Sequence, residues 1–221
     1  MSILPLFPTI MHIVEIPNFH NIQGKLVEYI YEQKETFETV TDRTNMGGWQ
    51  SEDTYHNSDN ILNTVVKDNL KDHLIDKGIL SKALDTVTGP IITAIRLTSL
   101  WINVNGKGHY NVQHNHPLSN FSGVFWIKSP VGSGDIKFRS PNTFSCYKEI
   151  SFYTKAFKEQ YNAYTSFNIP PQEGVMLIFP SFLLHSVEEN LSDEDRISVA
   201  FNLDIGSVSE LTEDTYVPFQ N

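Results

Sequence analysis

Two histidines one residue apart, His114 and His116, have a spacing that could bind a metal ion. In a β-strand, residues two apart project from the same face, and a rise of about 3.3 Å per residue puts their Cα atoms roughly 6 to 7 Å apart. Two imidazoles can converge on one ion from that separation. Pro117 ends the strand and places the pair near its rim. The pair is weak evidence alone, because most HxH pairs are incidental.

A third histidine, His185, lies in the apolar run GVMLIFPSFLLHSV at 174–187. A lone histidine in such a run is more often a hydrogen-bonded core residue than a ligand. Beside an HxH pair, however, it completes a set of three imidazoles, a number found in catalytic metal sites.

The run RISVAFNLDI at 196–205 alternates between polar and apolar residues. Such alternation usually means a strand with one wet face. If the polar face instead turns into a barrel, Arg196 and Ser198 supply donors that suit a carboxylate, which a guanidinium binds through two hydrogen bonds.

An HxH pair, a distant histidine and an arginine eleven residues after it resemble the pattern of Fe(II)- and 2-oxoglutarate-dependent oxygenases, which have HxD or HxE in place of HxH. Other short segments resemble one branch of that prolyl-hydroxylase-like superfamily, found in marine bacteria and phages. The segments cover nearly the whole chain, and their order and spacing together are fairly specific. They are LFPTI at 6–10, GGWQS at 47–51, WINVN at 101–105, HNHP at 114–117, SGVFW at 122–126, FPSFLLHSV at 179–187 and RISVAFN at 196–202.

The resemblance implies an oxidoreductase that uses dioxygen to hydroxylate an unidentified substrate, a small molecule or a protein side chain. His114, His116 and His185 would hold Fe(II) and form the catalytic group. The co-substrate would be 2-oxoglutarate, with its far carboxylate bound by Arg196 and Ser198.

One departure from the family pattern is that His116 stands where a carboxylate ligand is usual. Without that carboxylate, the iron centre is one unit more positive. Three-histidine iron sites exist in cupin-like dioxygenases, so the change is compatible with oxygen chemistry. It leaves open that His116 lies beside the ligands and that water or another group, such as Asp135, is the third ligand.

Several further side chains are candidates for the same site. Asn103 would reach the co-substrate if its strand neighbours the HxH strand, although a strand-end cap is an equal interpretation. Tyr110 shares the face of His114 if that strand is regular. Trp101 and Trp126 would line a substrate cleft or belong to the core. Trp49 lies in a polar stretch, and loops over a barrel mouth often become lids.

Three other functions fit parts of the pattern. A zinc hydrolase or hydratase also uses three histidines with an open position, but needs no carboxylate anchor after the last ligand. A three-histidine dioxygenase would bind its organic substrate without 2-oxoglutarate. A non-enzymatic jelly-roll module would bind carbohydrate or a protein partner, and its histidines would be scattered over the surface.

The elements that position these side chains change type near residue 89. Before it, helical spacing recurs over 24–37 and 60–76; after it come short runs rich in β-branched and aromatic residues, separated by turn residues. The sequence therefore predicts a mostly β single domain over 1–221. A double-stranded β-helix of jelly-roll or cupin-like type forms the catalytic core over 89–221, with an N-terminal strand and helices over 1–88 packed on it.

Composition narrows the class further. The chain has 221 residues and a formal net charge of −10, from 16 Lys+Arg against 26 Asp+Glu, which disfavours general nucleic-acid binding. Cys146 is the single cysteine, so an intrachain disulfide is excluded and a reducing compartment is favoured. No signal peptide and no membrane span are expected, which indicates a cytoplasmic protein. Exposed barrel edges leave a homodimer open.

Overall fold

The structure is a computed structural model in which most of the chain can be described. The described residues are 8–40, 44–53, 55–57, 59–77, 79–80, 83–86, 89–142, 152–207 and 216–217. Cys146, on which the prediction about disulfides rests, lies outside them.

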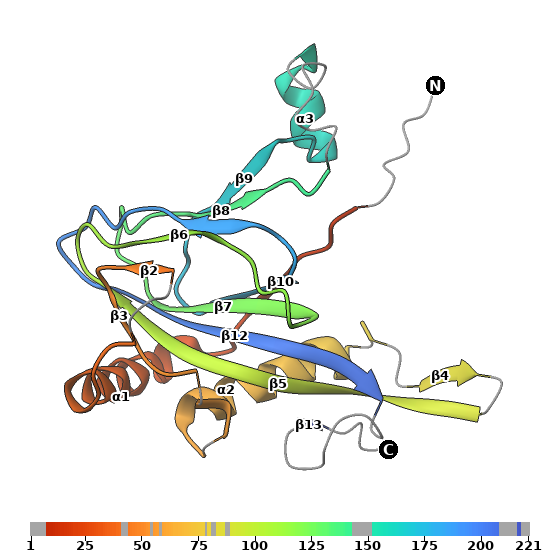
Figure 1. Ribbon diagram of the computed structural model, residues 1–221, viewed down its shortest axis with the longest axis horizontal. Helices are drawn as coiled ribbons and strands as arrows, with labels where there is room; N and C mark the ends of the chain where they lie inside the picture. Colours follow the sequence, from red (N-terminus) through yellow and green to blue (C-terminus); the bar gives the residue numbers. More distant parts are fainter. Residues whose placement is uncertain are drawn as a thin grey trace.

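Two antiparallel sheets lie one above the other (Figure 1). The major sheet has the strand order β1-β10-β7-β12-β5-β13, with β3 and β4 also paired to β5. Its strands are β1 (His12–Glu15), β3 (Trp49–Gln50), β4 (Ala83–Thr86), β5 (Gly89–Asn105), β7 (Phe121–Lys128), β10 (Val175–Pro180), β12 (Arg196–Ser207) and β13 (Tyr216–Val217).

The minor sheet has the strand order β2-β6-β11-β8-β9. Its strands are β2 (Asn45–Met46), β6 (Tyr110–His114), β8 (Ile136–Arg139), β9 (Ser166–Ile169) and β11 (His185–Val187). From β5 to β12 the chain passes repeatedly from one sheet to the other, which is the winding of a double-stranded β-helix. The predicted mostly β fold of jelly-roll type is confirmed.

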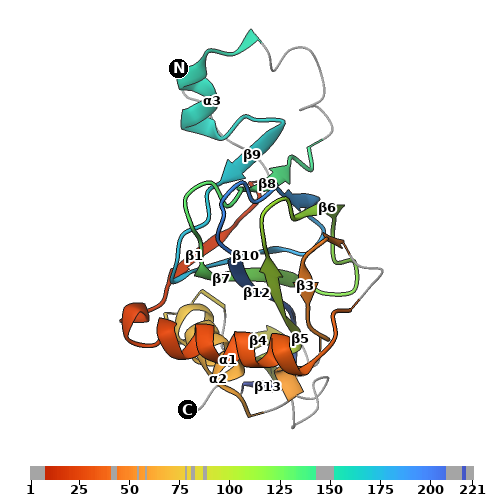
Figure 2. The same cartoon turned by 90° about the vertical axis from the view of Figure 1, so that its left-hand side faces the viewer.

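Two helices cover the outer face of the major sheet, away from the minor sheet (Figure 2). They are α1 (Gln23–Thr36) and α2 (Ile61–Leu70), and a π-helix, η3 (Lys71–Asp76), continues α2. Helical spacing puts Leu26 and Ile30 of α1 on one buried face. The Asn60 side chain accepts a hydrogen bond from the backbone N–H of Asn63 and so caps the start of α2. The expected helical packing on the sheet is therefore present.

The strands of the major sheet carry different residues on their two faces, as β12 shows. Ile197, Val199 and Phe201 are 0% exposed and join the helices in the larger hydrophobic core. The ring of Phe201 lies against Gly123 of β7, so closely that a Cβ at Gly123 would collide with it. The glycine is thus needed for packing on this face.

The space between the two sheets holds a smaller hydrophobic cluster. Its members include Trp126, Phe138, Leu177 and Phe179, contributed by both sheets. Trp126 is 3% exposed and therefore belongs to this core, one of the two roles considered for it.

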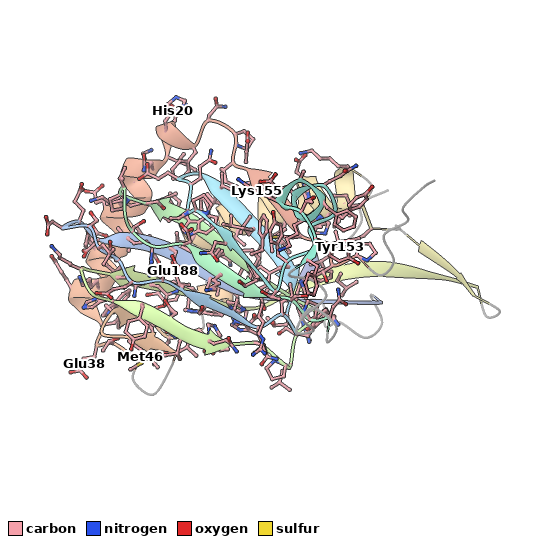
Figure 3. All side chains as sticks on the ribbon, turned by 90° about the horizontal axis from the view of Figure 1, so that it is seen from above. His20, Glu38, Met46, Tyr153, Lys155 and Glu188 are labelled. Atoms are coloured by element: carbon pink, nitrogen blue, oxygen red, sulfur yellow. The ribbon has the colours of Figure 1, made fainter. Side chains whose placement is uncertain are left out.

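Two short 3-10 helices, η1 (Phe19–Asn21) and η2 (Tyr55–Asn57), flank the larger helices. Beyond the minor sheet, α3 (Lys155–Tyr161) projects above β8 and β9, an element that the sequence pattern did not predict (Figures 1 and 2). Seen from above, Tyr153 and Lys155 of this arm lie apart from Met46 on β2 (Figure 3).

Trp49 does not lie in a loop that could form a lid, as its polar surroundings in the sequence suggested. It lies in β3, paired to β5, and is 9% exposed, with its Nε1–H donating to the carbonyl oxygen of Phe37. Burial in the larger core explains why this aromatic residue sits in an otherwise polar stretch. None of the described helices is long and apolar enough to cross a membrane.

Candidate metal centre

Two of the three histidines come from neighbouring strands of the minor sheet. His114 of β6 and His185 of β11 are directly opposite each other, and their ring centroids are 4.3 Å apart. The Nδ1 atom of His114 lies 2.7 Å from the carbonyl oxygen of Val112, and that of His185 lies 2.9 Å from the carbonyl oxygen of Leu183. A carbonyl only accepts, so Nδ1 carries the proton in both rings and Nε2 presents a lone pair.

His116 lies just beyond the end of β6, in the turn that leads to β7, rather than within the strand. Its ring centroid is 5.1 Å from that of His114 and 5.3 Å from that of His185. The ligand atoms of the three histidines all lie within 4.8 Å of one another. The structure therefore brings together the three residues that the sequence singled out.

Burial keeps these imidazoles neutral. It lowers the pKa of His185 to about 3 and that of His116 to about 4, and it also lowers the pKa of His114. Charge on His114 opposes protonation of both of the other rings. A neutral imidazole is the form that binds a metal, so the group fits a divalent ion at neutral pH without losing protons.

Aromatic rings surround the histidines. The ring centroids of Phe179 and Phe138 lie 4.9 Å and 5.8 Å from that of His185, and Trp101 lies 5.7 Å from His116. Phe138 is directly opposite Phe167 of β9, which is 47% exposed. Both phenylalanines in the minor sheet were missed from the sequence. Their alternation in short strands was visible, but the strand order was not.

Arg196, the first residue of β12, is buried between the sheets and is 1% exposed. Its Nη1 donates to the carbonyl oxygens of Ser133 and Glu188, the latter at 3.1 Å. Its Nη2 has no hydrogen-bond partner among the described residues. Burial lowers the pKa of this guanidinium to about 10, which still leaves it charged at neutral pH. A buried cation with a free donor fits an anionic ligand.

Ser198 and Asn103 lie next to this arginine. Ser198 is directly opposite Asn103, and Arg196 is directly opposite Asn105, so all four side chains share the inner face of the major sheet. The condition stated for Asn103 is not met, because β5 lies in the sheet opposite to β6. Asn103 reaches this region through its pairing with β12 instead.

Two further polar groups in this region were missed from the sequence. The Oδ1 of Asn105 and the Oγ of Ser133 are buried without a hydrogen-bond partner in the described part of the chain. Ser133 lies in the turn between β7 and β8, and only the fold brings this turn beside Arg196.

Tyr110 and Asp135 are not brought to the histidines. His185 and Val187 pair with His114 and Asn111, two positions against three, so β6 contains an irregularity and the assumed regular alternation is wrong. Tyr110 is 40% exposed. Asp135 is not part of the metal-binding group found among the described residues.

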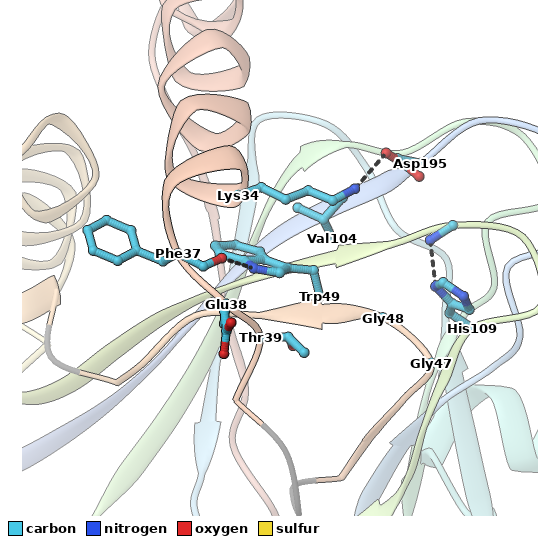
Figure 4. A pocket seen from close by; sticks show the side chains of 11 residues that line it. Lys34, Phe37, Glu38, Thr39, Gly47, Gly48, Trp49, Val104, His109 and Asp195 are labelled. Atoms are coloured by element: carbon cyan, nitrogen blue, oxygen red, sulfur yellow. Dashed lines mark hydrogen bonds and ion pairs between the residues drawn. The ribbon is translucent and has the colours of Figure 1, made fainter.

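A surface cavity of about 330 Å³ lies elsewhere, between the C-terminal end of α1 and the turn at Gly47–Gly48 (Figure 4). None of the three histidines lines it. Lys34 and Asp195, which line it, pair with each other at 3.9 Å, and Trp49 lines it as well. The candidate chemistry therefore lies with the histidines inside the jelly roll, not in this cavity.

Three neutral imidazoles and a buried guanidinium are thus the groups between the two sheets that could hold a metal ion and an anionic ligand. Residues 99–202 match the family described as "Putative 2OG-Fe(II) oxygenase". The matched part of the chain contains all three histidines and Arg196. An oxidoreductase with Fe(II) and 2-oxoglutarate, as predicted, is thereby confirmed. Membership of the marine bacterial and phage branch stays a prediction.

Solved structures of such oxygenases share the fold. The non-heme alpha ketoglutarate dependent epimerase SnoN from nogalamycin biosynthesis is 13% identical, with a TM-score of 0.60 over 90% of this chain and 79% of its own. The carbocyclase SnoK is 10% identical, with a TM-score of 0.60 over 96% and 90%. A Pseudomonas putida prolyl-4-hydroxylase is 10% identical, with a TM-score of 0.56 over 90% and 94%. No curated protein matches the chain.

Proposed function

We propose that His114, His116 and His185 hold Fe(II), and that Arg196 and Ser198 bind the far carboxylate of 2-oxoglutarate. The observation that carries this assignment is the Nη2 of a buried arginine, without a hydrogen-bond partner among the described residues, between the same two sheets as three converging imidazoles. A buried charge is costly unless an ion or hydrogen bonds compensate it, so this donor needs a partner that the described chain does not supply.

The spacing of the two ends fits a short dicarboxylate. Trp101, which contacts the ring of His116, is directly opposite Ala200 on β12. Arg196 precedes Ala200 by four residues in that strand, so the Cα atoms of these two residues lie about 13 Å apart. The Nη1 of Arg196 donates to the carbonyl oxygen of Glu188, which is three residues beyond His185, roughly 10 Å along an extended chain. A separation of this order suits a five-carbon dicarboxylate between guanidinium and metal.

Each group has a separate task. Fe(II) with 2-oxoglutarate would supply dioxygen activation, in which oxidative decarboxylation of 2-oxoglutarate to succinate and CO2 takes up one oxygen atom and hydroxylation of a substrate C–H bond takes up the other. The chain's own residues fix geometry. Arg196, Ser198 and Asn103 orient the co-substrate, and the aromatic residues beside His185 exclude water.

An anaerobic titration of the Fe(II)-loaded protein with 2-oxoglutarate tests the assignment. A metal-to-ligand charge-transfer band in the visible is expected for the wild type. It should be lost in His116→Ala and should require far more 2-oxoglutarate in Arg196→Ala. Arg96→Ala is the matched control, because this arginine pairs with Asp204 on the same sheet and should leave the titration unchanged.

Other outcomes would identify the competing functions. Iron binding without a band would favour a three-histidine dioxygenase that binds its substrate directly. An unchanged band in His116→Ala would place His116 beside the ligands rather than among them. Absence of metal binding would contradict the assignment as a whole.

Narrower statements stay predictions from the sequence. These are a phage source, a cytoplasmic location, a homodimer, the absence of nucleic-acid binding, and a division into a support region over 1–88 and a catalytic core over 89–221. That the substrate is a small molecule or a protein side chain is likewise a prediction from the sequence.

A further inference from the structure

The three histidines are held in two different ways. His114 and His185 lie in strands, and the Nδ1 of each ring is tied to a carbonyl oxygen of its own strand or the residues leading into it. His116 lies outside β6, and no hydrogen bond to its ring is found among the described residues. Its orientation must therefore come from other contacts. This matters because His116 is one of the three histidines whose ligand atoms converge.

Trp101 supplies one of these contacts. Its ring centroid lies 5.7 Å from that of His116, with the two planes inclined by 31°. His185 contacts the same imidazole in a nearly parallel arrangement, at 5.3 Å and 8°. Trp101 projects from β5 directly opposite Ala200, whose small side chain leaves space on the inner face of the sheet. The imidazole of His116 is thus restrained by ring packing rather than by a hydrogen bond.

The backbone of His116 is restrained by a second device. Its N–H donates to the carbonyl oxygen of Ser181 at 2.9 Å. The hydroxyl groups of Ser181 and Ser122 are 2.8 Å apart, and Ser122 donates to the Oδ1 of Asn202 at 2.8 Å. Because the Ser122 hydroxyl proton is used on Asn202, Ser181 is the donor to Ser122. Ser181 and Ser122 are 0% and 1% exposed, so water does not compete with these bonds.

The far end of the turn is also fixed. The backbone N–H of Asn120 donates to Leu203, its carbonyl oxygen accepts from Ser181, and its side chain accepts from the N–H of Ile205 at 2.7 Å. The turn that carries His116 is therefore bonded at both ends to Ser181, which follows β10, and at its Asn120 end also to β12. These hydrogen bonds fix the backbone of the turn, and His116 is the histidine of the three that lies in this turn rather than in a strand.

We propose that Trp101 and the buried Ser181–Ser122–Asn202 chain are positioning residues for His116, which set its backbone position and the plane of its imidazole. The inference rests on the proposed metal site. An imidazole is longer than the side chain of aspartate and binds through one atom of a flat ring, so both the backbone position and the ring plane must be set. Outer partners of metal ligands commonly change metal affinity by about 10- to 100-fold.

The test is a titration of the apoprotein with Co(II), followed by its visible spectrum and by calorimetry. We expect Trp101→Leu and Ser122→Ala each to raise the dissociation constant about tenfold or more and to change the Co(II) spectrum. Trp101→Phe, which keeps an aromatic ring, should recover most of the affinity. The matched controls are Trp49→Leu and Ser51→Ala, which remove a buried indole and a buried hydroxyl on the helix side of the sheet.

A double-mutant cycle separates positioning from general damage to the fold. If Trp101 acts through His116, Trp101→Leu should have no further effect on Co(II) affinity once His116→Ala is present. An equal loss in both backgrounds, or an unchanged spectrum in Trp101→Leu and Ser122→Ala, would overturn the inference while leaving the metal site intact. Failure of the wild type to bind Co(II) would instead contradict the proposed function, and the inference with it.

Discussion

The two faces of β12 differ in what they contribute. The outer face, with Ile197, Val199 and Phe201, is completely buried against α1 and α2 and makes only apolar contacts. The inner face, with Arg196 and Ser198, is almost as inaccessible but polar. Burial alone therefore does not separate core from site.

The difference lies in whether the buried groups are satisfied. Apolar groups on the outer face gain about 25 cal/mol per Å² removed from water and need no partner. On the inner face of the sheet, the Nη2 of Arg196 on β12 and the Oδ1 of Asn105 on the neighbouring β5 are buried without a hydrogen-bond partner among the described residues. Buried polar atoms without partners cost stability, so a ligand or water bonded to them would offset this cost. The comparison shows that one strand can stabilise the fold with one face and hold a ligand with the other.

The largest effect should come from the outer face. Phe201→Ala removes a fully buried ring and should lower the free energy of unfolding by about 3–5 kcal/mol, measured by urea denaturation. At low urea, where the variant is still folded, its Co(II) affinity should match that of the wild type. A loss of affinity in the folded variant would show that the two faces are not independent.

A smaller effect on stability is expected from the inner face. Arg196→Met replaces a buried charge by an apolar side chain of similar length. Relief from burying the charge and loss of the bonds to Ser133 and Glu188 oppose each other, so unfolding should stay within about 2 kcal/mol of wild type. Affinity for 2-oxoglutarate should nevertheless fall at least about 30-fold. Equal losses of stability and affinity would argue that Arg196 is structural.

A third effect is expected on the pH dependence of stability. The pKa of His116 is lowered to about 4 in the folded protein, against an ordinary value of 6.5, so the unfolded chain binds more protons between these values. The contribution of His116 is fully present above pH 6.5 and is lost as the pH falls toward 4. Urea denaturation of the metal-free protein at several pH values should show a shallower pH dependence in His116→Gln. An identical pH dependence in the wild type and the variant would mean that folding does not lower the pKa of His116.

The positions of most strands were predictable from local sequence. The run at 196–205 alternates over its whole length and forms β12, and the helical spacing of 60–76 corresponds to α2 and η3. The arm containing α3 was missed, because seven helical residues give too little periodicity to distinguish from a loop. The irregularity in β6 was also missed, since a bulge depends on the register with β11 rather than on the residues of β6 alone.

Local sequence by itself determined the residue types and their spacing: three histidines able to bind a metal, an arginine after them, and alternation that gives each strand two different faces. Only the tertiary structure decided which of these residues meet. It placed His185 opposite His114, set Asn103 beside Ser198 in the opposite sheet, and brought Ser133 and Trp101 to positions that no spacing indicated. The physical reason is that a strand's own pattern defines its faces, whereas its neighbours are chosen by the packing of the whole chain.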